Sequence, residues 1–143
     1  MPLRSKSLRR RAFLPELPID TLKFSFAMAD AALDKKALDP ILLRVEELVS
    51  YADYVLVLTA TSTPHSDAVV DSCVQRAKAM GVRALAVEGR RKNWCLVDFG
   101  DIVVHVFLQE YRGYYDLEGL WHDAQRLEIP GVEPVGDVLP FRV

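Results

Sequence analysis

Two apolar runs separated by a short turn constrain the fold of this chain more than any other feature. Residues 94–98 (WCLVD) and 102–108 (IVVHVFL) are rich in β-branched and aromatic residues, and Phe99, Gly100 and Asp101 separate them. Runs of this length on either side of a Gly-containing turn are typical of a β-hairpin. The sequence therefore predicts an antiparallel strand pair, and with it a sheet in which further strands lie beside this pair.

The segments upstream of the hairpin predict the remaining elements of an α/β domain. Apolar residues recur at helical spacing over residues 21–36. A second helix is predicted over residues 64–80, with Thr63 as its cap and Gly81 after its end. The order strand, helix, strand over residues 54–87 predicts a parallel pair. Short β-branched runs predict strands at residues 41–45, 54–59 and 82–87. We therefore expect the fold class α/β (α+β), as a single domain with a mixed, mainly five-stranded sheet flanked by helices.

The two ends of the chain differ from this central part. Residues 109–115 and 116–125 are predicted as short helices, whereas the tail from Pro130 contains too many Pro and Gly residues for regular structure. Residues 1–15 hold five of the chain's 18 basic residues and none of its 20 acidic ones. The expected division is a basic N-terminal extension over residues 1–20, a folded domain over 21–126 and an irregular tail over 127–143.

Length and composition exclude several classes of protein. The chain has 143 residues, of which 50% are hydrophobic, and this suffices for a single core. No run approaches the roughly 20 apolar residues that span a bilayer, so no membrane association is predicted. The apolar surroundings of Cys73 and Cys95 predict reduced, buried thiols. We expect a cytoplasmic protein, with a mitochondrion or plastid as the alternative if the basic N-terminus is a transit peptide.

The histidines and cysteines do not form the pattern of a metal site. His65, His105 and His122 lie far apart in the sequence, and neither Cys73 nor Cys95 has a second ligand at the short spacing of zinc sites. His105 lies in the middle of a predicted strand, where a structural histidine is more common than a ligand. We therefore predict no metal and no cofactor.

The acidic and hydroxyl residues make a weak case for catalysis. Ser62, His65 and Asp67 surround a predicted helix N-terminus, where capping explains them. Asp98 and Asp101 are three positions apart across a turn, whereas two acids on one strand face need a spacing of two. No catalytic residue is therefore predicted. The alternative that stays open is a nucleotide-binding or nucleotidyltransferase-like enzyme that uses Thr61, Ser62, Asp98 and Asp101.

The first strand of the hairpin offers a candidate binding surface. Alternation places Trp94, Leu96 and Asp98 on one face of the strand and the intervening residues on the other, so one of these faces is core. A Trp that directly follows a basic loop fits a binding hot spot with a basic rim. The spacing fits equally well a Trp at the edge of the core. The basic rim would consist of Arg90, Arg91 and Lys92.

Several stretches of the sequence carry a family resemblance. Residues 87–89 and 93–107 (VEG and NWCLVDFGDIVVHVF) look like a family signature, and residues 115–124 are similar to the closing motif YDLE-x-LW-x-DA. Residues 37–62 resemble the opening segment, except that Ala60 stands where the family has a glycine. Most of the chain thus resembles the ribosomal silencing factor family, also called the Iojap family.

The resemblance implies a nucleotidyltransferase-like fold without transferase chemistry. It implies binding to ribosomal protein L14 on the large ribosomal subunit, which blocks association with the small subunit and represses translation under nutrient limitation, and a role in large-subunit biogenesis. The basic N-terminal arm lies outside the resemblance, so its charge is either a targeting address or a peripheral contact with rRNA. A homodimer of the free protein also stays open. The expected partner-binding residues are Trp94, Leu96, Asp98, Phe99, Gly100, Asp101, Tyr115 and Asp116.

Overall fold

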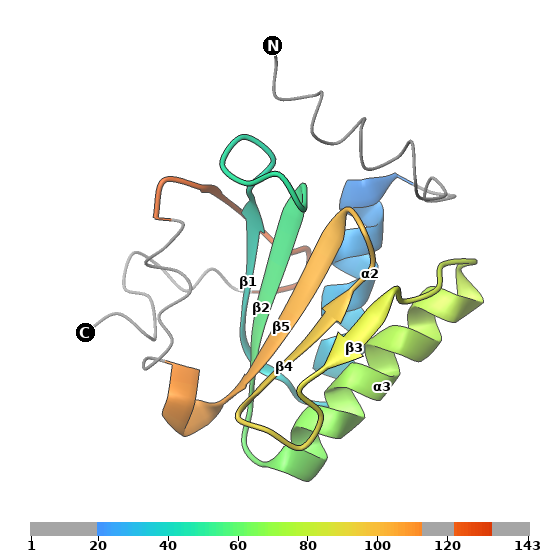
Figure 1. The fold of residues 1–143 in the computed structure, drawn as a ribbon, viewed down its shortest axis with the longest axis vertical. Helices are drawn as coiled ribbons and strands as arrows, with labels where there is room; N and C mark the ends of the chain where they lie inside the picture. The colour runs from blue at the N-terminus through green and yellow to red at the C-terminus, as the bar shows by residue number, and fades with distance from the viewer. Residues whose placement is uncertain (1–19, 113–121, 133–143) are drawn as a thin grey trace.

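The computed structural model of the chain describes residues 20–112 and 122–132 (Figure 1). This part of the chain holds a six-stranded sheet, two α-helices and a short 3-10 helix. The strand order is β3-β4-β5-β2-β1-β6, in which β2 and β5 are parallel and all other neighbours antiparallel. The elements are α2 (Thr21–Asp34), β1 (Leu38–Arg44), β2 (Tyr54–Ala60), α3 (Thr63–Ala79), β3 (Ala86–Glu88), β4 (Trp94–Asp98), β5 (Ile102–Leu108), the 3-10 helix (Gln109–Tyr111) and β6 (Gln125–Leu127).

The predicted α/β class, both long helices and the hairpin are confirmed. Helix α2 begins at the predicted residue, whereas α3 begins at Thr63, one residue before the predicted start, with Ser62 and not Thr63 as its cap. Asp20 accepts from the backbone N–H of Leu22 (2.9 Å), and Ser62 from that of His65 (3.2 Å). Such caps satisfy backbone donors that have no partner inside the helix. The strands β4 and β5 have the predicted bounds and pair antiparallel.

The prediction of a parallel pair is right for residues 54–59 but wrong for the strand that pairs with them. We expected residues 54–59 and 82–87 to pair, but β2 pairs in parallel with β5, and the three-residue β3 is an edge strand that pairs with β4. The physical reason lies in burial. Every residue of β2 and β5 is buried, as is typical of central parallel strands, whereas β3 is only partly buried.

The sheet also has six strands where mainly five were expected. Residue Gln125, predicted as the end of a helix, begins β6 and lies opposite Arg44 of β1. A three-residue edge strand is too short to give a periodic signal in the sequence. Of the predicted short helices, residues 109–111 form the 3-10 helix, whereas residues 113–121 lie outside the described part of the chain, as do residues 1–19 and 133–143.

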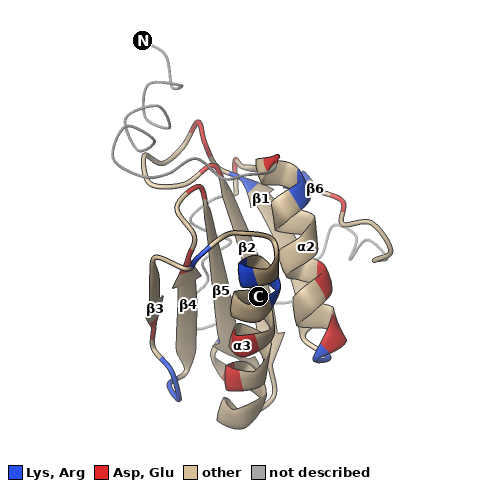
Figure 2. Cartoon of the chain, turned by 90° about the vertical axis from the view of Figure 1, so that its right-hand side faces the viewer, with Lys and Arg blue, Asp and Glu red and all other residues tan. Residues whose placement is uncertain are grey.

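The two α-helices lie side by side on one face of the sheet, which we call the helix face (Figure 2). The larger core cluster fills the space between these helices and the sheet, and includes Phe24, Leu56 and Val104. A second, smaller cluster with Val55, Val57 and other residues lies on the opposite side, which we call the far face. The sheet therefore carries apolar side chains on both faces, but α2 and α3 cover only one of them.

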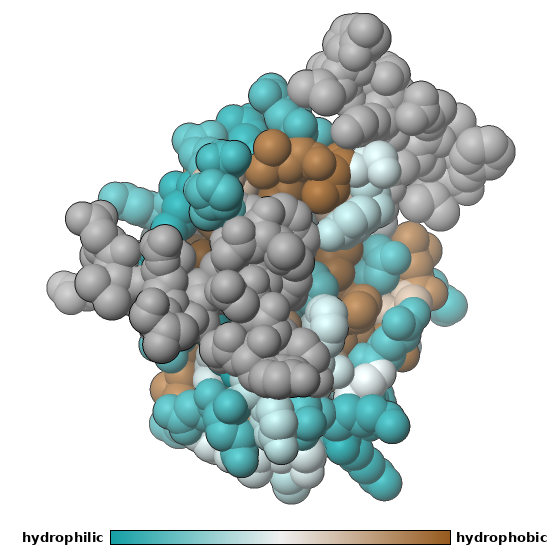
Figure 3. All heavy atoms as spheres, turned by 60° about the vertical axis from the view of Figure 1, so that its left-hand side comes forward, coloured by the Kyte–Doolittle hydropathy of each residue, from teal (hydrophilic) through white to brown (hydrophobic). Residues whose placement is uncertain are grey.

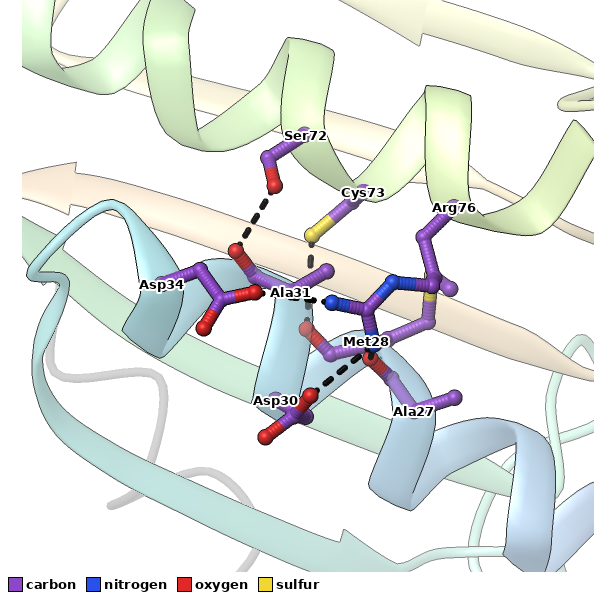
Figure 4. Close-up of polar contacts among 8 residues, drawn as sticks. All are labelled: Ala27, Met28, Asp30, Ala31, Asp34, Ser72, Cys73 and Arg76. Carbon is purple, nitrogen blue, oxygen red and sulfur yellow. Dashed lines mark hydrogen bonds and ion pairs between the residues drawn. The ribbon is translucent and has the colours of Figure 1, made fainter. Parts of the chain in front are cut away.

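Polar contacts fasten α3 to α2 (Figure 4). The Ser72 hydroxyl donates to the carbonyl oxygen of Ala31 (2.8 Å), in a stretch of α2 whose alanines are buried. The Arg76 guanidinium pairs with Asp30 (3.0 Å) and with Asp34 (2.8 Å). These contacts reinforce an apolar interface, and they tie the two helices into one layer.

Hydrophobic residues on the described surface are dispersed. On the face that Figure 3 shows, the hydrophobic residues outside the grey atoms form several separate groups. The exposed large apolar side chains are Leu38, Leu48, Tyr51 and Leu85, with exposed fractions between 37% and 48%. Leu48 and Tyr51 share the loop between β1 and β2, and the other two lie in separate segments. Within the described ranges, neither α-helix has the length and apolar character needed to cross a membrane. A binding surface must therefore be found from the surroundings of individual side chains.

Candidate functional site

Strand β4 turns alternate side chains to the two faces of the sheet, as the sequence predicts. Cys95 and Val97 are fully buried in the core under the helices. Trp94 and Leu96 are only partly buried and pack against the smaller cluster on the far face. Asp98, at the end of the strand, is also partly exposed. Trp94 and Leu96 are thus the apolar residues of β4 that a partner can reach.

The Trp94 indole is held by two side chains of the neighbouring strand β5. Its Nε1–H donates to Nδ1 of His105 (3.0 Å). Its ring stacks on Phe107, with centroids 5.2 Å apart and planes at 26°, and lies tilted beside the His105 ring at 5.8 Å. Trp94 and Phe107 are direct partners in the β4–β5 register, so these contacts follow from cross-strand pairing. We call Trp94, His105 and Phe107 the aromatic cluster.

His105 is a buried, uncharged member of this cluster. Only 6% of its surface is exposed, and burial lowers the pKa of its imidazole from 6.5 to about 4. A neutral imidazole has one donor and one acceptor nitrogen. Because Nδ1 accepts from Trp94, the proton lies on Nε2. Burial of His105 confirms the prediction of a structural histidine, but its bond to Trp94 was missed, although the hairpin register places it diagonally from Trp94.

The start of β4 depends on a close approach between two backbone segments. Gly89 has φ of +81°, and a Cβ atom at this position would lie 2.1 Å from the carbonyl oxygen of Trp94. No other residue fits here without moving that carbonyl. The backbone N–H of Leu108 donates to the carbonyl of Asn93 (3.0 Å), which holds the same end of the strand against β5.

The predicted site residues in the β4–β5 turn are largely interior. Phe99 is 3% exposed, and its ring packs edge-on against Phe24 under the helices at a centroid distance of 5.2 Å. Gly100, at φ +100°, donates its N–H to the Asp98 carboxylate (2.8 Å). Asp101 is 6% exposed. The structure therefore does not bring Phe99 or Asp101 to a surface with Trp94; they belong to the frame that fixes the turn.

The predicted basic rim points mainly toward the helix face. Arg90 pairs with Asp71 of α3 (2.7 Å), and Arg91 lies 3.8 Å from Asp67 of the same helix. Lys92 is exposed. Since Trp94 lies on the opposite face, Arg90 and Arg91 do not border its indole. The other two predicted partner-binding residues, Tyr115 and Asp116, lie outside the described residues.

The residues of the alternative enzyme hypothesis lie at two ends of the sheet. Thr61 and Ser62 follow the end of β2, whereas Asp98 and Asp101 flank the turn that leads into the start of β5. Because β2 and β5 are parallel and in register, about 20 Å of strand separates the two pairs. The described residues hold no group of three or more metal-ligating side chains. The geometry thus assembles no nucleotidyltransferase-like site from these four residues.

The loop after β2 is also occupied by its own hydrogen bonds. The Thr61 N–H donates to Nδ1 of His65 (2.9 Å), and Nε2–H of His65 donates to the carbonyl of Lys35 (2.7 Å). Together with the Ser62 cap, these bonds join the loop to both helices. This supports the interpretation of Ser62 and His65 as structural residues.

Comparison with known proteins gives consistent results. A family model described as "Ribosomal silencing factor during starvation" matches residues 19–138. The chain is 36% identical over 104 residues to "Ribosomal silencing factor RsfS" of Halalkalibacterium halodurans, covering 72% of this chain and 89% of that protein. It is 35% identical to the mouse protein "Mitochondrial assembly of ribosomal large subunit protein 1", covering 69% of this chain and 46% of that protein.

A solved structure supports the same relationship. A crystal structure of a protein from Chromobacterium violaceum superimposes with a TM-score of 0.71 at 33% sequence identity, covering 82% of this chain and 98% of that one. The fold described above is therefore shared with that protein over nearly its entire length. The names of the relatives concern ribosome silencing in one case and large-subunit assembly in the other.

Proposed function

Because the chain belongs to the ribosomal silencing factor family, we propose that it binds the large ribosomal subunit through ribosomal protein L14 and blocks association with the small subunit. Translation is then repressed when nutrients are limiting, and the same contact serves large-subunit biogenesis. The family's role is regulatory, and we propose that this chain performs it without catalysis.

The observation that carries this proposal is the partly exposed pair Trp94 and Leu96 on the far face of β4. Trp is enriched at the centres of protein interfaces, where one or two buried aromatic anchors supply most of the binding free energy. Both side chains are mounted on a sheet strand and not on a loop, so they are presented in a fixed geometry. Asp98 lies two residues further along the same strand and adds a carboxylate for a basic partner.

To block association, the protein only has to cover part of the surface where the large subunit contacts the small one. A specific interface buries about 800 Å² on each partner, which a chain of this size can supply from one face. A bound protein then excludes the small subunit by its volume. The acidic excess of the chain outside residues 1–15 favours a basic ribosomal protein over bare rRNA.

The test is co-sedimentation of Trp94→Glu with purified large subunits. The substitution places a charge on the proposed anchor, and we expect the affinity to fall by about 30-fold or more, as for loss of a hot-spot residue. Leu85→Glu is the matched control, because Leu85 is 48% exposed and precedes β3 at the edge of the sheet. It should bind like the wild type. A folded Trp94→Glu protein that still binds fully would refute the assignment of this surface.

A further inference from the structure

We propose that His105 is a positioning residue for partner binding: it fixes the Trp94 indole on the far face and occupies its N–H, so that the partner meets the indole through its carbon surface alone. The proposal rests on the proposed function, because it assigns a role within the same surface. It also states the chemistry that the partner must offer at this point, namely an apolar contact without a hydrogen-bond acceptor for the indole.

The first step is the orientation of the ring. The Nε1–H of Trp94 bonds to Nδ1 of His105 (3.0 Å), and the indole face stacks on Phe107 at 5.2 Å. One contact fixes an edge of the ring and the other fixes a face. A side chain that is already ordered loses less conformational entropy when a partner binds. The aromatic cluster therefore presents Trp94 in the orientation that the partner contacts.

The second step is the saturation of the polar group. Indole has a single donor and no acceptor, and His105 already takes that donor. The acceptor is permanent at physiological pH because burial keeps the pKa of His105 near 4 and the ring neutral. His105 itself is only 6% exposed, so it acts on a partner through Trp94 and not by direct contact. The far face thus offers an aromatic anchor with no unmet hydrogen bond.

The test compares two polar substitutions of His105 that differ in the position of the acceptor. In His105→Asn the side-chain oxygen can occupy the place of Nδ1, whereas in His105→Gln the amide reaches the place of Nε2. The readouts are the exchange rate of the Trp94 indole proton, followed by ¹⁵N NMR in a Trp121→Phe background, and the affinity for purified large subunits. Unfolding temperatures check that each variant is folded.

We expect the Asn variant to keep a protected indole proton and to bind within about 3-fold of the wild type. The Gln variant should lose protection and bind about 10-fold more weakly, which corresponds to the loss of a typical hydrogen bond that orients an anchor. A general structural role of His105 would weaken both variants alike and would overturn the proposal. Equal binding by wild type and the Gln variant, or an unchanged indole exchange rate, would also overturn it.

Failure of the proposed function gives a different result. In that case the wild type itself does not co-sediment with large subunits, and the inference falls with it. If the wild type binds, Trp94→Phe supplies a further control. It removes the N–H together with part of the ring, so its loss of affinity should be larger in the wild type than in the His105→Gln variant, where the bond between the two side chains is already absent. Equal losses in the two backgrounds would mean that this bond does not contribute to binding. That outcome would refute the inference and leave the proposed function standing.

Discussion

The two faces of strand β4 differ in burial, and the proposed function uses only one of them. On the helix face, Cys95 and Val97 are fully buried beneath α2 and α3. On the far face, Trp94 and Leu96 stay partly exposed, and Trp94 is held by a hydrogen bond and a ring stack within the sheet. Adjacent residues of one strand therefore lie in different surroundings. Substitutions on the helix face should act on folding, and those on the far face mainly on binding.

The largest difference in stability between substitutions on the two faces is expected from Phe24→Ala on the helix face. Phe24 is fully buried in α2 and packs edge-on against Phe99. Loss of a buried Phe side chain leaves a cavity and costs about 3–5 kcal/mol of unfolding free energy. Urea denaturation measures this change, and Trp94→Ala is the matched control, expected to destabilise less because its side chain is partly exposed. Equal losses in the two variants would show that Trp94 is a core residue and would remove the contrast between the faces.

On the far face, the buried His105 should make the stability of the fold depend on pH. The pKa of His105 is lowered from 6.5 to about 4 in the folded chain, so the unfolded chain takes up this proton first as the pH falls. Stability from this group is complete above pH 6.5 and declines between pH 6.5 and about 4. The total loss is about 3 kcal/mol, at 1.36 kcal/mol for each unit of pKa difference.

The measurement is the unfolding free energy of wild type and His105→Asn between neutral and acidic pH. Carboxylates titrate in both proteins, so the difference between the two curves isolates His105. We expect the wild type to lose more stability than the Asn variant on acidification. Parallel curves would mean that His105 has an ordinary pKa and is not buried among its neighbours in the sheet.

The sequence determines the hairpin and helices well because each has a local signal. The alternation in β4 separates its two faces, but it does not say which of them is core. The choice of strand partners is not local. Strand β5 lies beside β2 at the centre of the sheet, and both strands are buried along their whole length, but they are more than 40 residues apart in the sequence, so no local pattern shows that they pair. The same holds for the site. Trp94 stands out by residue type, but its bond to His105 depends on the hairpin register, and the burial of Phe99 depends on Phe24 of a distant helix.

The smallest expected effect concerns the charges on the helix face. Arg76 is 32% exposed at its side chain and pairs with Asp30 and Asp34, both of which are largely exposed. Exposed pairs contribute about 0.2–1 kcal/mol each and weaken as salt screens them. Arg76→Met keeps much of the aliphatic packing, so we expect the unfolding free energy to fall by about 1 kcal/mol at low salt and by less at high salt.

Arg91→Met is the control for this prediction. Arg91 is 86% exposed and 3.8 Å from Asp67, so the unfolding free energy of this variant should not change measurably. Both variants should bind large subunits like the wild type, because these side chains point toward the helix face. If Arg91→Met weakens binding, the partner reaches around the edge of the sheet to the β3–β4 loop, and the basic rim predicted from the sequence belongs to the interface after all.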